Sequence, residues 1–258
     1  MKHIKRKFLF HEYLKNHETL QNNMNFVTKE GLDEGFLKSK AKNNFTIIET
    51  DLNEKFFSFI YNNNGKHTII PVPDFALVNF DFAYKLNLDR IKLKNELLEL
   101  LSNLNQQNEV SSTSAYDFYG AATTCLICLF TSIECFINDI IPENYEYKIV
   151  NDRKTEIYNK SQIQYSISFN DKITKVLPNA LNKNFFSKPT PSNIHIHNLR
   201  SIRNEIIHTK SDKTGKLQVE ILKKLLKFKY EETFKAVFDF FNFYKTLYIE
   251  ECPCENNW

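Results

Sequence analysis

The sequence predicts a mainly α-helical protein that carries a small α+β extension at its N-terminus. Three observations lead to this prediction. The 258 residues include only 5 glycines and 7 prolines, a scarcity that disfavours turn-rich sandwiches and barrels. Apolar residues recur at helical spacing through most of the chain after residue 80. A hairpin pattern precedes that point, and the 42% hydrophobic content is that of a chain that folds.

The hairpin pattern is the clearest feature of the N-terminal part. Phe56–Tyr61 and Lys66–Val72 are rich in aromatic and β-branched residues, and they flank a turn that contains Asn64-Gly65. An Asn-Gly pair between two apolar runs predicts a short β-hairpin. Thr46–Ile48 is a candidate third strand.

The extension is expected to cover residues 1–105. From Phe80 to Asn105, leucines return at helical intervals and predict a helix. The stretch that follows is polar and predicts a linker over residues 106–114. A separate helical bundle is expected to occupy residues 115–251.

Four helical segments are predicted within this bundle. The first runs from about Ala115 to Ile141, and the second covers roughly Lys154–Leu177. The third begins after Ser192, a plausible N-cap residue. A short helix can precede the last one, which has apolar residues at helical spacing: Phe234, Val237, Phe238, Phe241, Tyr244 and Leu247.

Several protein classes are disfavoured by composition. The chain has no glycine-rich phosphate-binding loop, which argues against a P-loop nucleotide hydrolase. Its basic start is not followed by the apolar run of a secretory signal. The uncharged run Phe118–Ile133 is shorter than the ~20 residues of a membrane span, so a core helix is expected. A cytoplasmic protein that does not enter the membrane is predicted.

The net charge of +3 is too small to indicate a nucleic-acid partner by itself. Two local clusters of basic residues are open to two interpretations, a solvated face or a surface for an anion. They consist of Lys2, Lys5, Arg6 and Lys7, and of Lys223, Lys224, Lys227 and Lys229.

Cysteines occur at metal-ligand spacing in two places. Cys125 and Cys128 form one pair, and Cys252 and Cys254 form another, so together they could supply four zinc thiolates. Cys125, Cys128 and Cys135, however, fall within a predicted amphipathic helix. There, small buried hydrophobic residues are the favoured interpretation, and five cysteines in all fit a reducing compartment.

His195 and His197 form an H-x-H pair, which in some proteins binds a metal ion. No cysteine or carboxylate accompanies them at ligand spacing. Ordinary residues at the start of a helix are the favoured interpretation, and neither a metal nor another cofactor is expected.

The most informative segment is the one that contains Arg203-Asn204-x3-His208. On a helix, with 100° between successive residues, an apolar stripe lies beside an arc that carries Arg203, Arg200, Asn204 and His208. The apolar stripe would dock the helix. The polar arc would suit the binding of a phosphodiester and the transfer of its protons.

This motif resembles the R-x4-6-H signature of the HEPN superfamily, in which a polar residue often follows the arginine. The order of the helices is also similar to a HEPN bundle. A long apolar helix with Glu134 and Asn138 comes first, and an aromatic-rich helix closes the chain. The resemblance covers about the second half of the chain and implies a HEPN-like antiparallel helical bundle.

The resemblance further implies a metal-independent endoribonuclease, of the kind that acts as a toxin or as an anti-phage effector in abortive infection. Arg203 and His208 would be catalytic, and Asn204 would orient or assist them. Members usually pair two motif helices across a homodimer to form one composite active site. RNA would be the substrate, and an antitoxin or regulatory protein is a further partner to consider.

The side chains themselves suit this chemistry. An imidazole exchanges protons near neutral pH, so His208 could assist attack of the RNA 2′-OH, which yields a 2′,3′-cyclic phosphate. The planar fork of Arg203 could bind the oxygens of the transition state. One histidine cannot easily be base and acid at once, which is a physical reason to expect two copies.

Auxiliary roles and rival functions remain open at this stage. Arg200 could bind a flanking phosphate or form a surface ion pair. Glu134 and Asn138 could face the cleft or form interhelical hydrogen bonds. A non-catalytic HEPN module that binds RNA, a nucleotide or a protein is the main alternative, and a helical scaffold with an accidental motif is another.

Overall fold

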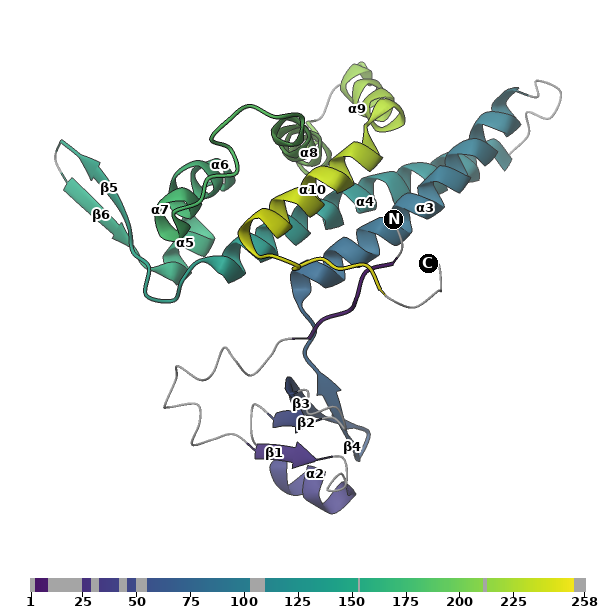
Figure 1. The fold of residues 1–258 in the computed structure, drawn as a ribbon. Helices are drawn as coiled ribbons and strands as arrows, with labels where there is room; N and C mark the ends of the chain where they lie inside the picture. Colours follow the sequence, from purple (N-terminus) through teal and green to yellow (C-terminus); the bar gives the residue numbers. More distant parts are fainter. Residues whose placement is uncertain are drawn as a thin grey trace. The chain divides into compact units, whose positions relative to one another are not determined.

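The protein consists of a small mixed unit and a larger helical unit (Figure 1). The small unit comprises Arg6–Asp74, and the helical unit comprises Met1–Lys5 together with Phe75–Trp258. The computed structural model describes residues 3–8, 25–28, 33–41, 46–49, 55–102, 110–152, 154–210 and 213–252.

The small unit is built on a four-stranded sheet in the order β1-β2-β3-β4. Strands β1 (Asn25–Thr28) and β2 (Thr46–Glu49) are parallel, whereas β3 (Lys55–Asn63) is antiparallel to both β2 and β4 (Lys66–Pro71). Helix α2 (Glu34–Lys40) lies between β1 and β2 in the sequence and contacts β4. The predicted third strand is thus confirmed as β2.

The predicted hairpin is also confirmed, and its turn explains why it forms. Asn64 and Gly65 have φ angles of 52° and 93°, the left-handed pair that a two-residue hairpin turn requires and that Asn-Gly adopts readily. The side-chain oxygen of Asn62 accepts a hydrogen bond from the Gly65 N–H at 2.7 Å, which closes the turn.

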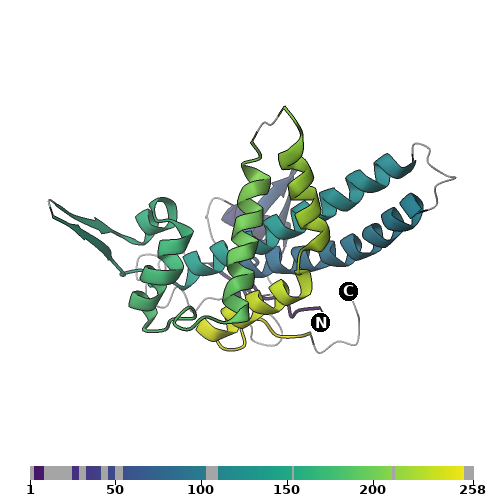
Figure 2. The same ribbon diagram turned by 90° about the horizontal axis from the view of Figure 1, so that it is seen from above.

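The helical unit is organised around one long apolar helix, α4 (Val110–Ile140). It packs along α3 (Phe75–Ser102) and contacts α8 (Pro191–Ile207), α9 (Lys216–Lys227) and α10 (Tyr230–Tyr244). Figure 2 shows α8 and α9 crossing the α3–α4 pair. The mainly helical fold is therefore as predicted.

The predicted domain boundary does not match the compact units. The division falls between Asp74 and Phe75, so the helix assigned to the extension belongs to the helical unit as α3. Its residues Leu77, Phe80 and Ala83 are buried in the same core as α4. Part of the predicted linker, residues 110–114, is already helical, and the rest lies outside the described residues. The boundary was predicted from a polar stretch of sequence. This prediction was wrong because a polar stretch can also connect two helices of one unit.

The second predicted bundle helix is wrong in its first part. Lys154–Tyr158 forms strand β6, which pairs antiparallel with β5 (Tyr147–Asn151). Thr155, Ile157 and Tyr158 are residues that favour strands. Asn159 then caps α5 through a reciprocal capping box with Gln162, so the helix cannot begin earlier.

Short helical pieces complete this region of the chain. They are α5 (Lys160–Ser166), α6 (Phe169–Asp171), the π-helix η4 (Lys172–Val176) and α7 (Leu177–Leu181).

The core of the helical unit is rich in aromatic side chains. Phe136 of α4 lies 4.4 Å from Phe241, 4.7 Å from Tyr248 and 6.0 Å from Phe240, measured between ring centroids. The apolar face predicted for α4 is confirmed, because its members are at most 1% exposed: Leu126, Leu129, Phe130, Ile133 and Ile137.

Among the described helices, α4 alone is long and apolar enough to cross a membrane, over Thr113–Ile140. Half of its most apolar window is buried inside the unit, and helices pack on it from several sides. A core helix of this kind passes the same test of length and composition, so the burial favours that interpretation.

Replacement of Phe136 by Ala should destabilise the helical unit by about 3–5 kcal/mol, the usual cost of removing a fully buried aromatic ring. Urea unfolding monitored by circular dichroism would measure the change. Tyr165→Ala is the control, since Tyr165 is 88% exposed and should change the free energy of unfolding by less than about 0.5 kcal/mol. Similar effects from both substitutions would contradict the assignment of the core.

Candidate functional site

Helix α8, which carries the motif, has Thr190 rather than Ser192 as its N-cap residue. The Thr190 hydroxyl accepts a hydrogen bond from the Asn193 N–H at 3.2 Å, and Pro191 occupies the first helical position. Proline suits that position because its fixed φ matches a helix and it has no N–H to satisfy. Ser192 instead lies within the helix, where its hydroxyl binds Asp239 of α10 at 3.3 Å.

The apolar stripe predicted for α8 is confirmed. Ile196 and Leu199 are fully buried, Ile202 is 3% exposed, and Ile206 packs at the margin of the core. This stripe docks the helix on α4 and α10, which leaves the polar residues of α8 at the edges of the contact and on the open side.

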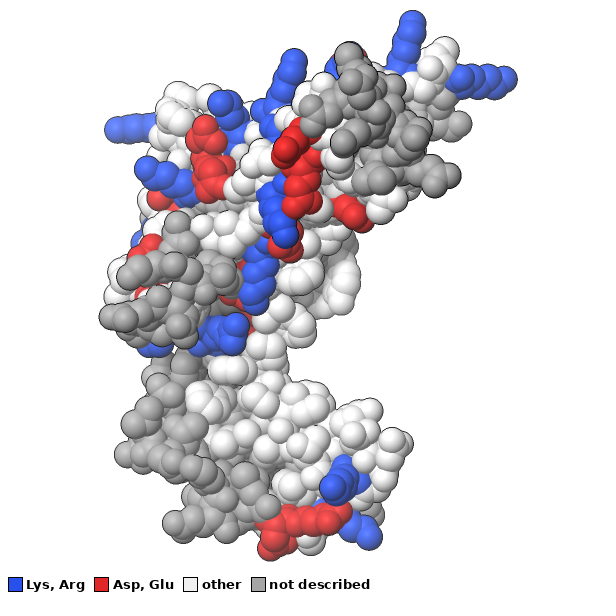
Figure 3. Space-filling view, turned by 90° about the vertical axis from the view of Figure 1, so that its right-hand side faces the viewer, with Lys and Arg blue, Asp and Glu red and all other residues white. Residues whose placement is uncertain are grey.

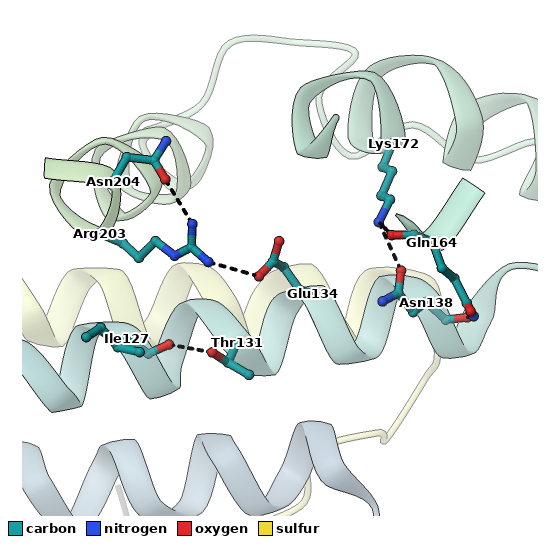
Figure 4. A network of polar contacts seen from close by, with 8 residues as sticks. All are labelled: Ile127, Thr131, Glu134, Asn138, Gln164, Lys172, Arg203 and Asn204. Carbon is teal, nitrogen blue, oxygen red and sulfur yellow. Dashed lines mark hydrogen bonds and ion pairs between the residues drawn. The ribbon is translucent and has the colours of Figure 1, made fainter. Parts of the chain in front are cut away.

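Arg203 lies at the edge that faces α4 (Figure 4). Its Nη2 is 3.6 Å from Oε2 of Glu134, and its Nη1 donates to Oδ1 of Asn204 at 3.1 Å. The guanidinium carbon lies 4.9 Å from the centroid of the Phe130 ring. With its side chain 24% exposed, Arg203 is held between an aromatic face, a carboxylate and an amide.

The buried Nε of Arg203 has no hydrogen-bond partner within the part of the chain that the structure describes. An arginine normally has all its buried donors satisfied. The guanidinium therefore retains a donor that its present neighbours do not use.

Asn204 and His208 lie at a groove between α8 and α9. This hollow has a volume of about 510 Å³ and is also lined by Ser201, Lys210 and Lys224. His208 is exposed and follows the last residue of α8, and its backbone N–H donates to the Asn204 carbonyl at 2.9 Å. Asn204 thus connects Arg203 on one side of α8 with the groove on the other.

A second hollow of about 460 Å³ continues along the same pair of helices. The two hollows share lining residues Ser201, Glu205, Glu220 and Lys224, so they form one surface feature, called here the α8–α9 groove. Glu205 of α8 binds Lys224 of α9 through both carboxylate oxygens, at 2.8 and 2.7 Å. This ion pair ties the two walls of the groove together.

The structure brings only part of the predicted polar arc into one place. Arg203 points towards α4, whereas His208 lines the α8–α9 groove. Arg203 and His208 are five residues apart. At 100° per residue, their side chains point in directions that differ by about 140° around the helix axis. The expectation of one continuous row is therefore corrected to two sides of α8 that are joined through Asn204.

Arg200 lies nearer the start of α8 than Arg203. Its guanidinium carbon is 5.9 Å from the centroid of the Phe169 ring. Within the described part of the chain, it forms no ion pair of 4 Å or less. The proposed phosphate contact of Arg200 remains a prediction.

Glu134 and Asn138 take different partners along α4. Glu134 reaches Arg203, as expected for a side chain that faces a neighbouring helix. Asn138 Oδ1 instead accepts a hydrogen bond from Lys172 Nζ at 3.2 Å, and Lys172 also donates to the Gln164 carbonyl at 2.7 Å (Figure 4). Asn138 thus forms an interhelical hydrogen bond, which was the alternative to a position facing the cleft. Among the described residues, no hydrogen bond connects it to Arg203.

Sequence reasoning missed Lys172, which is 7% exposed. Burial lowers the pKa of its ammonium group, and the charge of Glu134 opposes this effect. No spacing rule marks a lysine as buried, since lysines are mostly exposed. Its position depends on the π-helix η4, whose wider turn appears only in the fold.

The histidine and cysteine residues do not assemble a metal site in the described part of the chain, where no group of three or more potential ligands lies together. His195 lines the α8–α9 groove, whereas His197 packs on the Phe186 ring at 5.4 Å. Cys125 is fully buried, and burial raises the pKa of its thiol far above its ordinary value. Cys254 lies outside the described residues.

No protein-family model, no curated protein and no solved structure matches this chain. The resemblance to HEPN proteins therefore depends on the motif and on the order of the helices.

Partial burial, together with the charge of Arg200, lowers the pKa of His197 below its ordinary value of 6.5. The folded state then binds this proton less readily than the unfolded chain does, so stability falls as the pH drops through 6.5. We expect the free energy of unfolding of His197→Gln to decrease less than that of the wild type between about pH 7.5 and 5.5. Urea unfolding at each pH would measure this, and identical slopes for the two proteins would contradict it.

Proposed function

We propose that this protein is a metal-independent endoribonuclease of HEPN type that acts as a cytoplasmic toxin or anti-phage effector. The observation that carries the proposal is the connection from Arg203 through Asn204 to the groove that His208 lines. A cation and an amide are thereby available at adjacent positions of one docked helix, with an imidazole about one turn further along, and the last two face an open groove.

The proposed reaction uses the 2′-OH of RNA as its nucleophile. His208 accepts the 2′-OH proton as the oxygen attacks phosphorus, and the bond from phosphorus to the 5′ oxygen breaks. The leaving oxygen takes up a proton, so the products are a 2′,3′-cyclic phosphate and a 5′-OH. No oxidant, reductant or metal ion is needed for this balance.

Arg203 would stabilise the negative charge that develops on the phosphate oxygens. Its contact with Glu134 at 3.6 Å is longer than a charge-assisted hydrogen bond of 2.7–2.9 Å. A phosphate could therefore compete with Glu134 for Nη2 of Arg203, whose side chain is 24% exposed.

Asn204 would act as the link between the two sides of the helix. Because its Oδ1 accepts from Arg203, its Nδ2 group is the part left to donate to a phosphate oxygen or to the imidazole. Figure 4 shows the amide nitrogen on the side away from Arg203. This orientation supports an assisting role for Asn204.

The proposal includes a homodimer. A single imidazole that has accepted a proton from the 2′-OH would have to pass a proton to the leaving oxygen in the same step, and a second copy of His208 removes this difficulty. The exposed position of His208 beyond the end of α8 is compatible with a composite active site. A dedicated inhibitor such as an antitoxin would be expected to bind there.

A second candidate function has a specific observation in its favour. Arg203 is three-quarters covered and already contacts Glu134 and Phe130, as in a structural arginine. In that case the protein is a non-catalytic HEPN module that binds RNA, a nucleotide or a protein. Arg200 would bind phosphate, Arg203 would hold α8 against α4, and His208 would only form a hydrogen bond.

Replacement of His208 by Ala should lower RNA cleavage by about 10²–10⁴-fold, because proton transfer is lost while the docked face of α8 is untouched. The assay is cleavage of total RNA and tRNA with analysis of the product ends. His197→Ala is the matched control, since His197 lies on the same helix but packs against Phe186. Equal activity of the His208 variant and the wild type would reject the ribonuclease assignment. RNA that is bound but not cut by either protein would favour the binding module.

Cleavage should continue at an unchanged rate in excess EDTA, because protons and cationic side chains supply the catalysis. The same RNA assay would be run after exhaustive dialysis against the chelator. A loss of activity that Mg²⁺, Mn²⁺ or Zn²⁺ restores would contradict the metal-independent mechanism.

A further inference from the structure

The α8–α9 groove carries a marked excess of positive charge. The residues that line its two hollows include five lysines and two glutamates. The lysines are Lys210, Lys223, Lys224, Lys227 and Lys229. All four residues of the second basic cluster in the sequence therefore lie along one groove, together with His208 at one end.

The two glutamates of the groove are already engaged with lysines. Glu205 binds Lys224 at 2.7 Å, and Glu220 lies 3.1 Å from Lys223. Among the described residues, no carboxylate lies within 4 Å of Lys227. The groove thus retains cationic charge after its internal ion pairs are formed.

Figure 3 shows lysine and arginine side chains over the helical unit on one face of the molecule, with acidic side chains between them. Four of the five groove lysines come from the short stretch Lys223–Lys229, and all five line a concave surface.

We propose that the α8–α9 groove binds the sugar-phosphate backbone of a single-stranded RNA and leads it to His208. The inference that the bound RNA is a substrate rests on the proposed ribonuclease function. The binding itself does not require cleavage. Lysine ammonium groups on flexible stems suit phosphates without regard to base sequence. Leu217, Ile221 and Phe228 also line the groove and can contact sugars and bases.

The dimensions favour a single strand over a duplex. Packed helices lie about 8–10 Å apart, so a groove between two of them is too narrow to enclose a double helix. Along α8, the groove extends from His195 to His208, which corresponds to about 20 Å at 1.5 Å per residue. Several nucleotides fit along this length.

Binding would be measured by fluorescence anisotropy with a labelled 2′-O-methyl oligonucleotide of about 12 nucleotides, which the wild-type protein cannot cut by 2′-OH attack. Lys227→Gln should raise Kd by about 3–10-fold and reduce the dependence of log Kd on log salt by about 0.7. The matched control is Lys235→Gln, which removes an exposed lysine of α10 that does not line the groove.

Glu220→Gln gives the opposite expected sign. It removes a negative charge from the groove and releases Lys223, so Kd should fall by about 2–5-fold. A merely destabilised protein would not bind more tightly. Thermal unfolding of each variant would accompany the titrations.

Unchanged affinity and salt dependence in Lys227→Gln and Glu220→Gln would overturn the proposal. It would also be overturned if a polyglutamate peptide of equal charge competed as well as RNA, since the groove would then suit an acidic protein. If the wild type binds RNA through these residues but cuts none, the proposed role of the groove is supported and the proposed ribonuclease activity is rejected. If it cuts RNA through His208 but its RNA affinity does not depend on the lysines, the proposed role of the groove is rejected and the proposed ribonuclease activity is supported.

Discussion

The burial of α4 is the constraint on which the helical unit depends. Its apolar residues face several neighbours rather than one, because α3, α8, α9 and α10 all contact it. A helix as long and as apolar as α4 can remain in water only if other elements cover its apolar faces. The aromatic side chains of α10 and the aliphatic stripe of α8 do so, and the position of every candidate site residue on α8 follows from this docking.

The docking explains why the motif is divided between two environments. Leu199 and Ile202 must face the core, and this requirement turns Arg203 towards Phe130 and Glu134 on α4. His208, about 140° further around the helix, is left beside α9. The arginine is thus held by its surroundings, while the imidazole remains accessible. A fixed cation and an exposed imidazole on one helix suit phosphate chemistry, and Asn204 is the residue that connects the two.

The same packing creates the charge pattern of the α8–α9 groove. Glu205 and Lys224 join the two helices, and the remaining lysines of α9 are thereby aligned along α8. Read in the sequence alone, these lysines fit a solvated helix face equally well. In the folded protein, α9 runs back beside α8 after a short connection. Lysines that are neighbours in the sequence therefore line one wall of a groove that ends at His208.

The sequence by itself determined those features that depend on neighbouring residues. The Asn64-Gly65 turn follows from local backbone preference, and the buried faces of α4 and α8 follow from apolar residues at helical spacing. Only the tertiary structure decided that Lys154–Tyr158 pairs as a strand, that α3 belongs with α4, that Lys172 is buried and that Arg203 and His208 face different neighbours. Each of these depends on which segments meet, near or far along the chain, and the periodicity within one segment carries no information about its neighbours.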